Sequence, residues 1–452
     1  MIAGPRGRWR AVVSDRTASC ARAVARDVAH RLRDGAAVES AAARAAAQSA
    51  HPDTRHWQPH GVAQGFAGLA LLAGSMDECF PGESWDAVAH AHLERAARGA
   101  AESDAPAGIF SGLSGLTFAT ARLSRNGTRY RRLAESLDAT LLPRVHDLAA
   151  AVPPGEPTSV AYFDLISGLS GVGASLLFRA HDPGCDAALR VVLDRLVLLC
   201  ECDERGLPRW WTPGEHLHPV SRADCPHGNL NCGLAHGIPG PLALMSLSLL
   251  RGVRVHGLEE AVARTAAWLG AHRADDAWGV NWPYAVPLDE TLRERVSPAA
   301  GDCLEAVPSR AAWCYGAPGV ARSLQLAARA LGARGYDTLA LDAMRAALAK
   351  PHAEREIPSP TFCHGLAGLL QITLRFAQDE NAADLAAAAD DLCRQLLDLY
   401  DADSPLGFRS VESERCAVDD PGLLDGTAGV ALVLLAASTD VEPGWDRAFL
   451  LS

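Results

Sequence analysis

The sequence lacks the features that mark a secreted, membrane-spanning or nucleic-acid-binding protein. Its twelve cysteines are spread over 452 residues, too sparsely for a disulfide scaffold. The N-terminus has arginines but no apolar segment typical of a signal peptide, and no apolar run approaches the roughly 18 residues of a membrane span. The net charge of −12 gives no support for binding to nucleic acid or an anionic membrane. We therefore expect a cytoplasmic protein with reduced thiols.

Aromatic residues are also scarce, at 6% of a chain that is 48% hydrophobic and rich in Ala, Leu and Arg. This composition favours helices that contact one another through aliphatic side chains. From about Asp15 to His51 the Ala/Arg-rich pattern predicts two helices without chemistry. His56 and His60 follow in a polar stretch, where exposed loop histidines are the common interpretation.

A Gly-x-x-Gly pair then recurs seven times, each time before an apolar segment. The pairs begin at Gly65, Gly112, Gly168, Gly237, Gly316, Gly365 and Gly426. Chance alone would place roughly three to four such pairs in a chain with this glycine content, so the shared apolar context carries the signal. Amphipathic segments lie between the pairs, which indicates two helices per unit. We expect an all-α fold of seven helical hairpins, either an open solenoid or an α/α toroid, with a helical lead-in over residues 1–60 and the repeats over residues 61–452.

Two segments interrupt the repeats. RGLPRWWTPGEHLHPVSRADCPHGNLNCG precedes Gly237, and DDAWGVNWPYAVPLDETLRERVSPAAGDCLEAVPSR precedes Gly316. Both are rich in Trp, Pro and Gly, so we expect them to form strands or long loops at the mouth of the toroid. Binding sites often lie on loops of this kind.

Two groups of residues have the chemistry of a zinc site. Cys314 in WCYGAPG and the adjacent Cys363 and His364 in CHGLAG precede similar glycine turns. Each cysteine should lie just before a helix N-terminus, where a thiolate is stabilised. Two thiols and an imidazole would leave one coordination position open, as catalytic zinc requires. The spacing alone does not exclude buried free cysteines.

A rival group lies in DCPHGNLNCGLAHG, with Cys225, His227, Cys232 and His236. Its local spacing suits zinc better than that of the first group. Asp164 and Asp425 precede Gly-x-x-Gly pairs at similar offsets. Either could face a central cavity, or could cap a helix or lie in its first turn.

Together, GLAHGIPG, WCYGAPG and CHGLAG resemble the lanthionine synthetase C-like family, the cyclases of lanthipeptide biosynthesis, which belongs to ribosomal peptide (RiPP) maturation. The resemblance extends from about Gly65 to Gly429. It implies an α/α toroid, a double barrel of helices, with zinc held by Cys314, Cys363 and His364, which decides against the cluster at Cys225. The site residues implied by position are His236, Asp164, Arg310 and Tyr315.

The resemblance also implies the reaction, in which a peptide cysteine thiol adds to dehydroalanine or dehydrobutyrine and closes a (methyl)lanthionine thioether ring. Arg310 would stabilise the enolate. His236, oriented by Asp164, or Tyr315 would deliver the proton. No fused dehydratase precedes the repeats, so we expect a stand-alone cyclase. Its partners would be a dehydrated precursor peptide, consisting of leader and core, and a separate dehydratase.

Three other functions stay open at this point. A toroidal glycoside hydrolase could use Asp164 and Asp425 as paired carboxylates, although the Cys, Cys, His group would then be unexplained. A family member could instead add another thiol, such as glutathione, to dehydrated residues. The protein could also be a non-catalytic, zinc-stabilised peptide-binding scaffold.

Overall fold

The computed structural model describes residues 9–153, 156–292 and 308–452, and these residues form two compact units. Unit 1 comprises the described residues up to Ala139, with Glu356–Ala448 and Ser452. Unit 2 comprises those of Thr140–Arg355, with Phe449–Leu451. The division falls within helix α6 (Arg131–Ala150). The division also falls within η4 (Gly444–Phe449), a 3₁₀ helix near the C-terminus.

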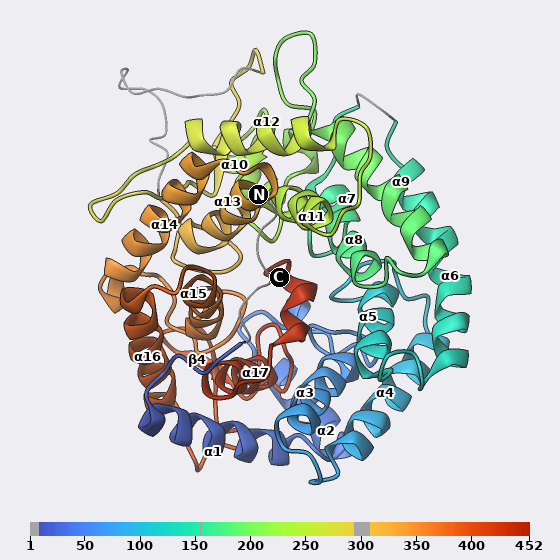
Figure 1. Ribbon diagram of the computed structural model, residues 1–452, viewed down its shortest axis with the longest axis vertical. Helices are drawn as coiled ribbons and strands as arrows, with labels where there is room; N and C mark the ends of the chain where they lie inside the picture. Colours follow the sequence, from blue (N-terminus) through green and yellow to red (C-terminus); the bar gives the residue numbers. More distant parts are fainter. Residues whose placement is uncertain (1–8, 154–155, 293–307) are drawn as a thin grey trace. The chain divides into compact units, whose positions relative to one another are not determined.

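Unit 1 consists mainly of helices, with one two-stranded antiparallel sheet (Figure 1). Its elements are α1 (Asp15–Arg31), α2 (Gly35–Gln48), η1 (Pro52–Thr54), α3 (Phe66–Cys79), α4 (Trp85–Ala101), α5 (Leu113–Leu123), α15 (Leu366–Glu380), α16 (Ala383–Asp398), β3 (Ser410–Ser413), β4 (Cys416–Val418) and α17 (Thr427–Ser438).

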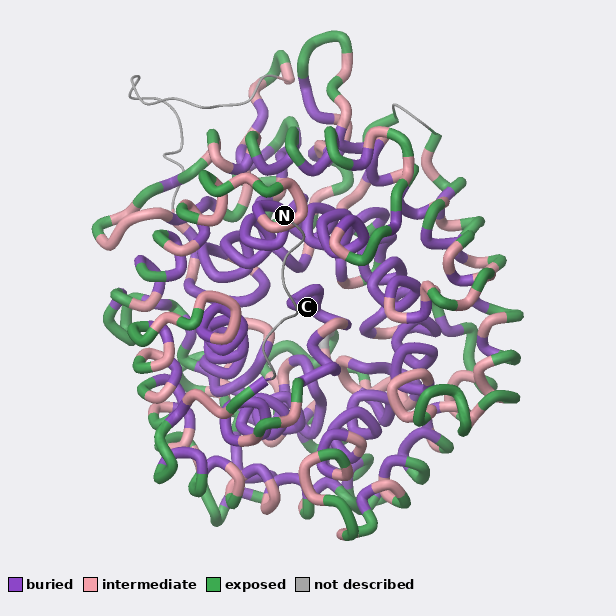
Figure 2. Tube along the Cα trace, viewed as in Figure 1, coloured by how far each residue is buried: buried purple, intermediate pink, exposed green. Residues whose placement is uncertain are grey.

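Two kinds of helix form unit 1. Helices α3, α5, α15 and α17 follow the glycine pairs and are buried along most of their length, whereas α1, α4 and α16 bury one face only. Figure 2 shows this contrast as burial along most of α3 and α17 and mixed exposure along α1 and α4. Helix α3 packs against α4, α5 and α17, and α15 packs against α16 and α17. A helix that is apolar all round needs such neighbours, because it has no face suited to water.

Unit 2 has the same two kinds of helix and a different two-stranded sheet. Its elements are α7 (Val160–Phe163), α8 (Leu169–Phe178), α9 (Pro183–Leu199), η2 (Gly214–His216), α10 (Pro219–Asp224), β1 (Asn229–Asn231), α11 (Pro239–Leu250), α12 (Leu258–Ala271), β2 (Ala285–Pro287), α13 (Ala317–Leu331), α14 (Arg334–Ala349) and η3 (His352–Glu354). The buried helices are α8, α11 and α13, with α11 in contact with both others. Helices α9, α12 and α14 each have an exposed face.

The glycine pairs have a recurrent structural reason. In six of the seven pairs the first glycine is the N-cap of the buried helix, and only α11 departs, with Ile238 as its N-cap. The second glycine often lies against a backbone carbonyl six residues earlier. A Cβ there would meet that oxygen at 2.2 Å at Gly68, 1.9 Å at Gly115, 2.3 Å at Gly319 and 2.1 Å at Gly429. A side chain at these positions would force the turn away from its helix.

Several expectations from the sequence can be compared with these elements. The two helices expected before His51 are present as α1 and α2, which confirms them. Strands or long loops were expected in the two interrupting segments, and strands β1 and β2 lie there and pair with each other. Residues 293–307 of the second segment lie outside the described residues. The prediction that His60 is an exposed loop histidine was wrong. Its side chain is only 5% exposed and contacts the Ser111 carbonyl at 3.0 Å, because neighbouring segments cover it.

Within the described ranges, no helix combines the length and apolar content that crossing a membrane requires.

Candidate active site

The loop that contains Cys314 is fixed in unit 2 by the glycine that follows it. Gly316 is the N-cap of α13 and has a φ of +92°, a conformation that side chains with a Cβ rarely adopt. A Cβ at Gly316 would also lie 1.7 Å from the carbonyl oxygen of Arg310. The tight turn places Cys314 two residues before the N-cap, as the sequence predicted, and the thiol is buried.

Asn281, from the second interrupting segment, ties both ends of this loop together. Its Nδ2 donates to the Ser309 carbonyl at 2.8 Å, and its Oδ1 accepts the Ala317 N–H at 2.9 Å. The side chain is 1% exposed, so these hydrogen bonds are shielded from water. The loop from Ser309 to Ala317 is therefore a rigid element of unit 2.

His236 and Asp164 form a hydrogen-bonded pair in the same unit. Asp164 Oδ2 lies 2.7 Å from His236 Nδ1, while Asp164 Oδ1 accepts the N–H groups of Ser167 and Gly168 at 2.8 Å each. The Asp164 side chain is 2% exposed and that of His236 41%. The two backbone hydrogen bonds to Oδ1 thus fix the orientation of the carboxylate. Its Oδ2 favours the imidazole tautomer with the proton on Nδ1, which leaves Nε2 available to other partners.

The surroundings of His236 affect its charge as well as its orientation. Burial lowers the pKa of His236, but the hydrogen bond and the negative charge of Asp164, together with Cys314, outweigh burial and raise the pKa above its usual value. A raised pKa favours the protonated imidazole, the form that can donate a proton. The sequence had also allowed Asp164 to act as a helix cap. Asp164 does not cap α8, whose N-cap is Gly168 without a side-chain hydrogen bond; one of its oxygens binds the turn before α8 and the other binds His236.

Arg310 and Tyr315 lie in a cluster with two residues that sequence reasoning missed, Tyr284 and Asn231. Arg310 Nε donates to the Tyr284 hydroxyl at 2.8 Å, and Asn231 Nδ2 donates to the Tyr315 hydroxyl at 3.1 Å. The rings of Tyr315 and His236 have centroids 6.4 Å apart. A Cβ at Gly233 would lie 2.5 Å from two ring carbons of Tyr315, so the glycine makes room for the ring.

Cys363 and His364 lie in unit 1, in the loop before α15. Their loop ends at Gly365, the N-cap of α15, so Cys363 also lies two residues before an N-cap glycine. The Cys363 N–H donates to the Leu424 carbonyl at 3.0 Å. His364 Nδ1 lies 3.6 Å from Asp425 Oδ1. Asp425 does not cap α17, whose N-cap is Gly426 without a side-chain hydrogen bond.

Comparisons with known proteins place the chain in a family. The sequence profile of the family described as "Lanthionine synthetase C-like protein" matches residues 56–450. The chain belongs to this family.

Individual members of the lanthionine synthetase C-like family are similar to it at low sequence identity. The chain is 24% identical to the nisin biosynthesis protein NisC of Lactococcus lactis subsp. lactis over 354 aligned residues. The aligned region covers 76% of this chain and 77% of that protein. The solved structure of nisin cyclase matches with a TM-score of 0.74 at 20% identity, over 92% of this chain and 97% of that structure. This structural match confirms the expected fold class, the all-α toroid.

The rival group around Cys225 does not form a metal site in the described part of unit 2, which contains no cluster of three or more possible ligands. His236 is engaged with Asp164, and the Cys232 thiol donates to the Leu230 carbonyl at 3.6 Å. The described residues of unit 2 therefore give no reason to prefer the Cys225 group over Cys314, Cys363 and His364, the ligands that the family resemblance implies.

A buried ionic network lies in unit 1 between the N-terminal segment and β3–β4. Arg55 contacts the carboxylates of Glu412 and Asp420, and its Nη2 donates to Ser410 Oγ at 3.0 Å. Burial would raise the pKa of Glu412, but hydrogen bonds from Ser49, Ala50 and Arg55 lower it to about 2. At Asp420 burial dominates and raises the pKa to about 6, despite the positive charge of Arg55. The network joins distant segments of unit 1.

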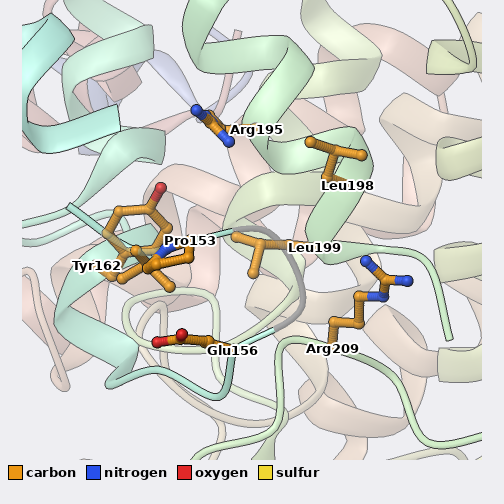
Figure 3. Close-up of a pocket in the computed structure, with 8 residues that line it drawn as sticks. Pro153, Glu156, Tyr162, Arg195, Leu198, Leu199 and Arg209 are labelled. Atoms are coloured by element: carbon orange, nitrogen blue, oxygen red, sulfur yellow. The ribbon is translucent and has the colours of Figure 1, made fainter. Parts of the chain in front are cut away.

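A pocket elsewhere in unit 2 contains none of the expected site residues (Figure 3). It is lined by Val152, Pro153, Glu156, Tyr162, Arg195, Leu198, Leu199 and Arg209. The Tyr162 hydroxyl donates to the Ala149 carbonyl at 2.9 Å, and burial raises the pKa of Tyr162. The candidate active site is therefore the polar cluster around Cys314 rather than this hollow.

Proposed function

We propose that the protein is a zinc-dependent lanthipeptide cyclase, which adds cysteine thiols of a peptide to dehydroalanine or dehydrobutyrine to form (methyl)lanthionine rings. Family membership and the names of its relatives, a nisin biosynthesis protein and a nisin cyclase, support this reaction. The observation that carries it is the Asp164–His236 pair in the same unit as Arg310 and Cys314. It would supply a positioned proton carrier and a cation beside a thiol.

The zinc ligands of this proposal are Cys314, Cys363 and His364. Their chemistry fits zinc, which prefers thiolate and imidazole ligands and keeps an open position in catalytic sites. Asp425 Oδ1 is buried without a hydrogen-bond partner among the described residues, 3.6 Å from His364 Nδ1. A metal-binding histidine commonly uses such a carboxylate to fix its other ring nitrogen. Bound to these ligands, zinc would lower the pKa of a substrate thiol from about 8.5, so that the thiolate forms at neutral pH.

The side chains of unit 2 would then handle the charge and the proton of the reaction. When the substrate thiolate adds to the β-carbon, a C–S bond forms and the electrons of the double bond move onto the carbonyl oxygen as an enolate. Arg310 would stabilise this negative charge. His236, held by Asp164, would deliver a proton to the α-carbon, and Tyr315 is the second candidate for this step. The thiol proton lost and the α-proton gained balance, so ring closure is an isomerisation.

The substrate would be a dehydrated precursor peptide with leader and core, produced by a separate dehydratase. We place the reaction in the cytoplasm, where the cysteines stay reduced. The division into a lead-in over residues 1–60 and a repeat domain over residues 61–452 stays a prediction. With the family known, nothing favours a glycoside hydrolase that uses Asp164 and Asp425.

The deciding experiment incubates the purified, zinc-loaded protein with a dehydrated peptide that contains cysteine, with glutathione present. Thiol alkylation and mass spectrometry then distinguish the outcomes. Ring closure leaves the peptide mass unchanged and removes the alkylatable thiol, whereas a glutathione adduct raises the mass. The Cys314→Ala protein serves as the control. A persisting free thiol with wild-type protein would reject the cyclase, and retained zinc without any thiol addition would favour the peptide-binding scaffold.

A further inference from the structure

The two segments that interrupt the helical repeats meet in unit 2 as a small sheet. Strands β1 and β2 pair antiparallel, with Asn231 opposite Ala285. Just beyond this pairing, the Cys232 N–H donates to the Tyr284 carbonyl at 2.9 Å. The register brings Asn231 and Tyr284 into neighbouring positions, although more than fifty residues separate them in the sequence.

Tyr284 contacts Arg310 in two ways. Its hydroxyl accepts the Nε–H of Arg310 at 2.8 Å, and the guanidinium carbon lies 5.7 Å from the centroid of the tyrosine ring. The ring of Tyr284 also lies against that of Tyr315, with centroids 5.1 Å apart. An arginine side chain has several rotatable bonds, but its guanidinium is planar with five N–H donors in a fixed arrangement, so a hydrogen bond at one of them limits the directions of the others.

Asn231 holds the other reactive side chain of the loop in a similar way. Its Oδ1 accepts the Gly233 N–H at 2.9 Å, which fixes the orientation of the amide. Its Nδ2 therefore faces the Tyr315 hydroxyl and donates to it at 3.1 Å. The sheet thus contacts Arg310 and Tyr315 through one side chain from each strand region, so its contacts are directed at the proposed site.

Tyr284 is also one of three large hydrophobic or aromatic side chains exposed in the described ranges, at 36%. A tyrosine whose only task was to fill the core would be buried. Its position at the surface of the loop, with the hydroxyl on a cation, is that of a group which orients a functional residue.

We infer that Tyr284 is a positioning residue for Arg310 in the proposed cyclisation. It holds the guanidinium through Nε so that the remaining N–H donors keep a fixed direction toward the enolate oxygen. This inference rests on the proposed function, because it assigns Arg310 the stabilisation of the enolate. It adds a residue outside the repeats to the catalytic apparatus.

The test is Tyr284→Phe, which removes the hydroxyl and keeps the ring. Loss of a hydrogen bond to a charged group should lower kcat roughly 10-fold or more, with KM and zinc content close to those of the wild type. Tyr336→Phe on α14 is the matched control and should leave all three unchanged. In an Arg310→Ala background, Tyr284→Phe should have no further effect, because the two residues act as one unit. Wild-type kcat in Tyr284→Phe, or fully additive effects, would overturn the inference.

A second readout does not require activity. The Nε–H of Arg310 should exchange with solvent slowly in the wild-type protein, as measured by ¹⁵N-resolved NMR, and roughly 10-fold or more faster in Tyr284→Phe. Unchanged exchange in Tyr284→Phe would show that the hydroxyl does not hold the guanidinium, and would overturn the inference. Slow exchange in a wild-type protein that fails to cyclise the peptide would instead reject the proposed function and leave the contact intact.

Discussion

The loops before α13 and α15 are built alike and surrounded differently. In both, a cysteine stands two residues before an N-cap glycine that opens a buried helix. In unit 2 the loop is accompanied by Arg310, Tyr315, Asn231 and the Asp164–His236 pair. In unit 1, His364 of the second loop lies beside Asp425. The difference teaches that the repeat fixes the position of the cysteine, whereas the polar side chains around it differ from one repeat to the next.

Two histidines show the same contrast between the units. His92 in unit 1 is 2% exposed, and burial lowers its pKa to about 4, although Nε2 contacts the Leu32 carbonyl at 3.1 Å. His236 in unit 2 has a buried carboxylate as its partner, which raises its pKa. Burial alone keeps an imidazole neutral and structural. A carboxylate beside the imidazole instead favours its protonated form.

The largest effect is expected on zinc binding, from substitution of the cysteine that stands at the same position in both loops. Cys314→Ala in unit 2 and Cys363→Ala in unit 1 should each reduce the zinc content from about one ion per chain to a small fraction, as for loss of one of three ligands, and abolish ring closure. Zinc is measured by inductively coupled plasma mass spectrometry after dialysis. Cys225→Ala, the matched control, should keep its zinc. Zinc retained in either loop variant and lost in Cys225→Ala would move the metal to the rival group.

The next effect concerns the buried network that is specific to unit 1. Arg55→Ala leaves the carboxylates of Glu412 and Asp420 without their cation, at side-chain exposures of 6% and 5%. We expect the free energy of unfolding to fall by about 3–5 kcal/mol, as when one partner of a buried ion pair is removed. Chemical denaturation measures it.

The control for Arg55 is an exposed pair in the same unit. Arg98→Ala breaks the ion pair with Glu94; the side chain of Arg98 is 64% exposed and that of Glu94 61%. Its effect should stay within about 0.5 kcal/mol. Equal effects of the two variants would mean that the Arg55 network does not stabilise unit 1.

Acid should destabilise the protein through His92. In the unfolded chain its pKa is near 6.5 and in the folded protein about 4, so the unfolded state binds the proton first as the pH falls. The stability is complete above pH 6.5 and is lost progressively toward pH 4, by roughly 3 kcal/mol from this group. His92→Gln should flatten the pH dependence of the unfolding free energy over this window. His90→Gln, at an exposed position, should not.

The smallest effect separates glycines inside the turns from a glycine outside them. Gly335 on α14 has open space around a Cβ, so Gly335→Ala should raise the free energy of unfolding by about 0.4–1 kcal/mol. Gly319→Ala should lower it, because a Cβ there meets the Trp313 carbonyl oxygen at 2.3 Å. Thermal unfolding followed by circular dichroism gives both signs. A stabilising Gly319→Ala would remove the close approach as the reason for the recurrent pairs.

The sequence predicted the parts of the fold that are local and repeated. The glycine pairs and apolar periodicity identify the buried helices, because each pair opens a helix through contacts a few residues away. The fold class also followed from these repeats and the family resemblance. His60 was mistaken for an exposed residue, since its burial depends on the segment around Ser111, fifty residues further on.

The site was predictable where a motif contains the residue. Asp164 and His236 were named in advance, but no spacing rule could show that they share a hydrogen bond across 72 residues. Tyr284, Asn231 and Asn281 were missed, because their roles depend on the pairing of β1 with β2 and on the closing of the loop from Ser309 to Ala317. Such contacts are set by tertiary structure, and the local sequence has no signal for them.

The most direct test of the account measures zinc content and ring-closure rate in the same His236→Asn protein. If Cys314, Cys363 and His364 bind the metal and His236 transfers the proton, this variant should keep about one zinc per chain. It should close the ring more slowly by about 10²–10⁴-fold, the usual loss for a general acid–base group. Loss of zinc in His236→Asn would make this histidine a metal ligand. Wild-type ring closure with full zinc would remove it from the mechanism and contradict the assignment of proton transfer to the Asp164–His236 pair.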